Sequence, residues 1–109
     1  MKEINLSMVR GDTTRIGVTL NNAETAPDEI IFSVKESKDR RTYVVQKSFG
    51  NGIEQDTSAT GLRYIIEIEP ADTSALRGGR YCYDIEVHIN GDVITPVMGG
   101  LMMTEDVTR

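Results

Sequence analysis

Apolar and polar residues alternate with a period of two along most of the chain. The alternating segments cover 4–8, 14–20, 30–35, 43–49, 62–69, 81–89 and about 93–104, with a short strand expected around Ile53. Successive side chains of a strand point to opposite faces, so this period predicts strands with one buried and one solvated face. No segment shows the i, i+3, i+4, i+7 spacing of a long amphipathic helix. The pattern predicts an all-β fold of seven or eight short strands, which favours an antiparallel β-sandwich.

Turn-forming residues separate the first two strands. Gly11 and Asp12 lie between them and predict a tight corner. With Arg10 they also spell the tripeptide that animal integrins recognise. Because a glycine beside an aspartate between two strands is turn chemistry, we assign Gly11 and Asp12 a structural role.

A short helical turn is expected near residues 71–76. Pro70 ends the preceding strand because it cannot donate to a ladder, and it suits the start of a helical turn. Asp72 or Thr73 can cap this turn. Gly79 follows another glycine and allows a sharp reversal of the backbone.

The last two strands are predicted to form a hairpin. Asn90 and Gly91 follow directly on the most regular alternation in the chain, and a two-residue type I′ turn requires positive φ at both positions. In the second arm, Pro96 and the pair Gly99-Gly100 suggest an edge, a bulge or a bend.

Composition narrows the class of protein. The 109 residues, 39% apolar and 27% charged, fit one soluble domain spanning 1–109. A net charge of -5 argues against nucleic acid as a partner. Cys82 is the single cysteine, no secretory start is evident, and no apolar stretch is long enough to span a membrane. We therefore expect synthesis in a reducing cytosol and no membrane partner.

One strand carries the candidate metal ligands. Asp84, Glu86 and His88 alternate and so share a face, which permits cation binding. Glu67 and Glu69, on another strand, could complete such a site or add to an acidic face. A strand with one solvated face gives this pattern by default, so we predict no metal and no cofactor here.

Catalytic constellations are not recognisable in the sequence. The one histidine, His88, lies six residues from Cys82 along the same strand, about 20 Å away in an extended chain. No nucleophile elbow or phosphate-binding glycine loop occurs. We therefore predict a protein that is not an enzyme.

The last strand is apolar at both parities. Leu101 and Met103, with Val97, can fill the core, which leaves Met98 and Met102 to face outward. Val97, Met98, Met102 and Met103 are therefore our candidate interface residues. A bulge at the glycine pair is the alternative, because it would turn all these side chains inward.

Five short motifs follow one another in an order that resembles a known family. They are Met8-Val9-Arg10-Gly11-Asp12-Thr13, Phe32-Ser33-Val34-Lys35, Pro70-Ala71-Asp72-Thr73, Gly79-Arg80-Tyr81-Cys82-Tyr83-Asp84-Ile85, and Gly99-Gly100-Leu101 before Glu105-Asp106-Val107-Thr108-Arg109. This succession resembles the N-terminal domain of phage upper-baseplate and tail-fibre proteins, a family of immunoglobulin-like modules of prophages. The similarity covers nearly the whole chain. Gly79-x-Tyr81 is also similar to the tyrosine corner of immunoglobulin-type sandwiches.

The resemblance implies a virion structural protein, a baseplate or tail connector or a fibre-anchoring module that docks on tail, baseplate or other virion proteins and forms a homo-oligomer. In that family the module continues into a stalk or receptor-binding segment, whereas this sequence stops at Arg109. A connector or adaptor is therefore expected. The alternative hypothesis is a carbohydrate- or cation-binding sandwich using Asp84, Glu86 and His88 or an exposed tyrosine such as Tyr43. The absence of tryptophan disfavours sugar binding.

Overall fold

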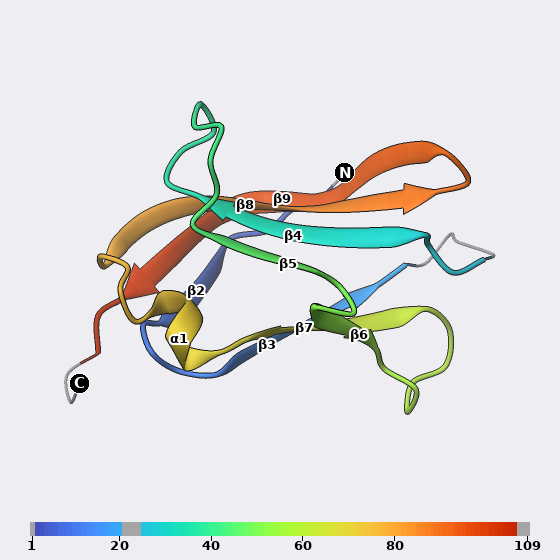
Figure 1. The fold of residues 1–109 in the computed structure, drawn as a ribbon, viewed down its shortest axis with the longest axis horizontal. Helices are drawn as coiled ribbons and strands as arrows, with labels where there is room; N and C mark the ends of the chain where they lie inside the picture. The colour runs from blue at the N-terminus through green and yellow to red at the C-terminus, as the bar shows by residue number, and fades with distance from the viewer. Residues whose placement is uncertain (1, 21–24, 107–109) are drawn as a thin grey trace.

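The structure, a computed structural model, describes residues 2–20 and 25–106. Within these ranges the chain forms nine strands and one short helix (Figure 1). In chain order they are β1 (Lys2–Glu3), β2 (Leu6–Val9), β3 (Thr14–Thr19), β4 (Glu29–Lys35), β5 (Val45–Phe49), β6 (Gly52–Gln55), β7 (Arg63–Ile68), α1 (Pro70–Thr73), β8 (Gly79–Ile89) and β9 (Asp92–Thr104). The first four residues of the predicted loop 21–28 and the last three of the motif at 105–109 lie outside the described residues.

The strands form one curled sheet in two layers. Its order is β1-β9-β8-β4-β5-β6-β7-β3, and β2 also pairs with β9. In Figure 1 the layer with β4, β8 and β9 lies above the layer with β3, β6 and β7. This immunoglobulin-like sandwich confirms the predicted fold class. The pairing is mixed rather than purely antiparallel, because β1 and β2 run parallel to β9 and β5 runs parallel to β6.

The core contains the inward residues that the alternation predicts. On β4 the side chains of Ile30, Phe32 and Val34 are at most 2% exposed. The same alternation holds on β7 and along most of β8. The other core residues are Met8, Val18, Val45, Ile53, Tyr64, Ile66, Ile68, Tyr81, Tyr83, Ile85, Val87, Leu101 and Met103.

The corner before β8 depends on Tyr81. Its hydroxyl donates a 2.8 Å hydrogen bond to the carbonyl oxygen of Arg77, four residues upstream, and the ring is buried. Gly79 has a φ of 139°, a conformation that side chains rarely adopt. This arrangement corresponds to the tyrosine corner of immunoglobulin-type sandwiches.

The helical turn α1 follows β7, and of the two residues predicted to cap it, Asp72 does so and Thr73 does not. Glu69 is the N-cap residue, and the Asp72 carboxylate accepts a 2.7 Å bond from the Glu69 amide. Thr73 is buried, and its hydroxyl instead accepts a 2.8 Å bond from the amide of Gly11. The predicted extent, 71–76, exceeds the helix, which ends at Thr73. Among the described residues no helix is long and apolar enough to span a membrane.

The corner between β2 and β3 has the predicted turn geometry. Gly11 is buried and has a φ of 82°. The amide of Asp12 donates to the carbonyl oxygen of Val9, and Arg10 forms a 3.0 Å ion pair with Asp106. The tripeptide at 10–12 therefore closes a corner of the fold.

The β8–β9 hairpin has a two-residue turn at Asn90 and Gly91, with φ angles of 50° and 84°. Both values are positive, as a type I′ turn requires. The bulge in β9 lies at Pro96, one of the two places suggested by the sequence, and not at the glycine pair. The register shifts between Ile85 and Val87, so that β9 carries two residues, including Pro96, opposite one residue of β8. The pairing continues without a shift through the glycine pair.

The N-terminal segment covers the outer edge of β9, which corrects the expectation of a free edge there. Between β1 and β2, the amide of Ile4 donates to the carbonyl oxygen of Met98, and the carbonyl oxygen of Ile4 accepts a 2.7 Å bond from the Tyr83 hydroxyl. The side-chain oxygen of Asn5 accepts a bond from the amide of Gly100. A Cβ added to Gly99 would lie 2.1 Å from the carbonyl oxygen of Ile4. Gly99 is thus a site of close backbone approach.

We predict that Gly99→Ala and Gly100→Ala have different effects on stability. The first substitution places a methyl group against the Ile4 backbone and should lower the free energy of unfolding by about 1–3 kcal/mol. The second meets its first neighbour at 3.4 Å and should change the free energy by about 0.5 kcal/mol or less. Urea unfolding of both variants measures the difference. Equal values would contradict the proposed packing of β1 and β2 on β9.

We also predict that Tyr81→Phe lowers the free energy of unfolding by about 1 kcal/mol, because it removes the bond to Arg77. Tyr64→Phe is the matched control. Its hydroxyl is buried without a hydrogen-bond partner among the described residues, so its removal should cost nothing. Thermal unfolding by circular dichroism compares the two, and a Tyr81→Phe variant as stable as the native chain would show that the bond does not stabilise the corner.

Candidate functional site

Two methionines lie on the solvent side of β9. Met102 is 40% exposed and Met98 is half-buried. Gly100 lies between them and adds no side chain, and its amide donates to the side-chain oxygen of Asn5. On the neighbouring strand Cys82 pairs with Gly100. We call Met98, Met102 and Cys82 the methionine face.

Register places the polar neighbours of this face in rows across three strands. Ser33 of β4 pairs with Asp84 of β8, which pairs with Met98 of β9. Arg80 of β8 pairs with Met102. A hollow of about 180 Å³ lies beside Met98, and its lining residues are Ser33, Lys35, Lys38, Cys82, Tyr83, Asp84 and Met98. The face is therefore an apolar strip with charged groups along its border.

Asp84 is the electrostatically perturbed group of this surface. Burial raises the pKa of its carboxyl above the ordinary aspartate value, the negative charge of Glu86 raises it further, and Lys35 opposes both effects. Desolvation penalises the charged form, so ionised Asp84 opposes folding.

The candidate metal ligands lie on the predicted face but do not converge. His88 Nε2 and Glu86 Oε1 lie 2.7 Å apart and interact with each other, whereas Asp84 lines the hollow. Glu67 lies on β7, in the other layer, where it forms a 2.9 Å ion pair with Arg15, so it cannot complete a site with Asp84. Over the ranges 2–20 and 25–106, no three His, Cys, Asp or Glu side chains group closely enough to hold a metal ion.

Two of the four candidate interface residues do not belong to the methionine face. Met103 is 2% exposed and lies in the core. Val97 is half-buried and lines a cleft on the inner side of the sheet. Met98 and Met102 remain available on the outer side, and Tyr43, named for the alternative hypothesis, is 52% exposed in the loop before β5.

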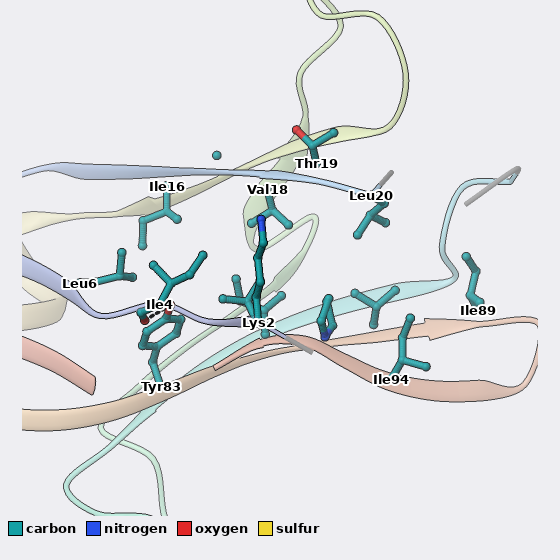
Figure 2. A pocket seen from close by; sticks show the side chains of 15 residues that line it. Lys2, Ile4, Leu6, Ile16, Val18, Thr19, Leu20, Tyr83, Ile89 and Ile94 are labelled. Carbon is teal, nitrogen blue, oxygen red and sulfur yellow. Dashed lines mark hydrogen bonds between the residues drawn. The ribbon is translucent and has the colours of Figure 1, made fainter. Parts of the chain in front are cut away.

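A cleft of about 610 Å³, which the sequence pattern did not predict, opens between the two layers. Its lining is largely aliphatic, and among the described residues Lys2 is the one charged side chain that lines it (Figure 2). The lining residues are Lys2, Ile4, Leu6, Ile16, Gly17, Val18, Thr19, Leu20, Tyr83, Ile85, Val87, Ile89, Ile94, Pro96 and Val97. In Figure 2 the side chains of Ile16 and Val18 point into it from β3, and that of Leu20 does so just after the strand.

Comparison with known proteins supports the assignment of the fold but not of a family or a function. No family model and no curated protein matches the chain. It is similar in structure to an endo-beta-1,4-mannanase from Thermotoga petrophila, with a TM-score of 0.60 and 13% identity over 94% of this chain. The chain spans 18% of that enzyme's length, so the likeness concerns the fold of one part of it. The extracellular domain of a voltage-gated sodium channel beta4 subunit aligns with a TM-score of 0.46 and 11% identity, covering 98% of this chain and 95% of that one.

We predict that Asp84→Asn raises the melting temperature at pH 7. The native state holds the Asp84 proton to a higher pH than the unfolded chain does, so stability rises as pH falls through the native pKa. The advantage of the variant should therefore shrink on acidification and vanish below about pH 3.9, the ordinary value for aspartate. Melting curves between pH 3 and pH 7 test this, and an advantage independent of pH would contradict the assigned cause.

Proposed function

We propose that the chain is a structural module of a phage or prophage virion that docks on other copies or on tail and baseplate proteins through the methionine face. The observation that carries the docking is the pair Met98 and Met102 on the outer side of a strand whose inner side is already in the core. The succession of five sequence motifs supports the virion assignment.

Methionine suits a contact surface of this kind. Its unbranched thioether side chain repacks readily against different partners. Met98 and Met102 lie on either side of Gly100, which has no side chain, so a partner could contact both methionines at once. Covering the pair would remove apolar area from water, which favours association.

Docking here uses side chains rather than strand pairing. The outer edge of β9 is occupied by β1 and β2, so its backbone is not free to pair with another chain. The charged border of Lys35, Lys38 and Arg80 fits the usual anatomy of an interface, in which an apolar centre has a polar rim.

We predict that a Met98→Lys, Met102→Lys double variant loses self-association. Static light scattering of the native chain over a range of concentrations should show a rising mass, whereas the variant stays at the monomer mass because two charges would be buried unpaired. A Tyr43→Lys, Val93→Lys variant is the control, since both residues are more than half exposed elsewhere on the molecule. It should associate like the native chain. A native chain that stays monomeric and binds no tail protein would contradict the proposal.

The virion assignment has its own test. Particles released after prophage induction in the native host, purified by density gradient, should contain the chain at a fixed ratio to the major tail proteins by quantitative mass spectrometry. Its presence in the lysate but not in intact particles would refute the virion role and leave the docking surface to be judged by light scattering.

A further inference from the structure

The cleft between the layers lies where the curled sheet fails to close. In the strand order of the described residues, β1 and β3 are the two ends. Both border the cleft, with Lys2 and Ile4 on the β1 side and Ile16 and Val18 on the β3 side (Figure 2). One further strand in this gap would join the two ends of the sheet.

The backbone of β3 is free to pair with such a strand. Just after β3, the amide of Leu20 donates to the carbonyl oxygen of Leu62, the residue before β7. Bonded and non-bonded pairs alternate in an antiparallel ladder, so Arg15, Gly17 and Thr19 direct their N–H and C=O groups away from β7. No other strand of residues 2–20 and 25–106 pairs with these groups, which form an edge along the mouth of the cleft.

The residues that line the cleft determine which side chains of an added strand would fit into it. The aliphatic lining calls for apolar residues at alternate positions of the incoming strand, because alternate side chains would point inward. Lys2 is exposed and extends from β1 toward β3 (Figure 2). It forms no ion pair with the residues in the described part of the chain, so an acidic side chain at the mouth would meet an unpaired cation.

We propose that this cleft binds an extended segment of a partner chain, which pairs with the free edge of β3, inserts alternate aliphatic side chains between the layers and places an acidic residue beside Lys2. This is strand addition, a recurrent mode of peptide recognition in which the backbone supplies affinity and the side-chain pockets supply specificity. The site is separate from the methionine face, so this inference stands whether or not the proposed virion role is correct.

The probe is an acetylated and amidated seven-residue peptide of alternating threonine and valine, with the third threonine replaced by glutamate. At saturation it should slow amide hydrogen exchange of Arg15, Gly17 and Thr19 at least about tenfold, since those amides gain partners. The same peptide methylated on the backbone nitrogens that face β3 cannot pair and should leave these rates unchanged.

A charge exchange tests the role of Lys2. Lys2→Glu should weaken binding of the glutamate peptide about fivefold and strengthen binding of the matching lysine peptide, as expected for an exposed ion pair. Lys35→Glu is the control, because it makes the same change of charge on the outer side of the sheet and should leave both affinities unaltered.

Three results would overturn the inference. Unchanged exchange at Gly17 and Thr19 with millimolar peptide would show that the edge does not accept a strand. Equal binding of the methylated peptide would show that the cleft takes any apolar molecule. Protection of the same amides by raising the concentration of the chain alone would show that the occupant is a second copy.

Discussion

The N-terminal segment has two strand edges within reach and can pair with one of them. It pairs with β9, where the backbone of Ile4 approaches so close to Gly99 that no side chain fits, and where the Tyr83 hydroxyl donates a hydrogen bond to the Ile4 carbonyl oxygen. This choice covers the long edge of β9 and leaves β3 without a neighbour on its outer side. Because β1 and β2 pair with β9 and not with β3, the cleft beside β3 stays open. For the same reason, the methionine face can bind a partner through its side chains but not through the backbone of β9.

Much of the fold could be predicted because alternation reports which side of a strand is buried. The inward rows of β4, β7 and β8 were predicted in this way, and the Asn90-Gly91 turn followed from the backbone angles that it requires. The alternation of apolar and polar residues does not indicate which strands pair with each other. The pairing of β1 and β2 with β9 was therefore missed. For the glycine pair an edge, a bulge or a bend was suggested, whereas Gly99 allows a close approach of two backbones.

The same limit applies to the candidate sites. The outward position of Met98 and Met102 follows from strand parity, and the structure places them there. The cleft could not be predicted, because Ile16 and Leu20 have the sequence pattern of ordinary core residues, and burial of an aliphatic row depends on whether the opposite layer is complete. Thr73 shows a related case: a hydroxyl next to a helical turn suggests a cap, but its partner, Gly11, is distant in the sequence.

The pairing of the first strands with β9 also bears on how the chain folds during synthesis. β1 and β2 leave the ribosome first, but their partner is made after nearly all the rest of the chain, and contacts between such distant segments form slowly. Throughout that interval β3 is already present with an open edge beside it. The nascent N-terminal segment can therefore pair with β3 before β9 is made. The later pairing with β9 is specific to one register, because the Ile4 backbone fits only against a glycine, and Gly99 supplies it.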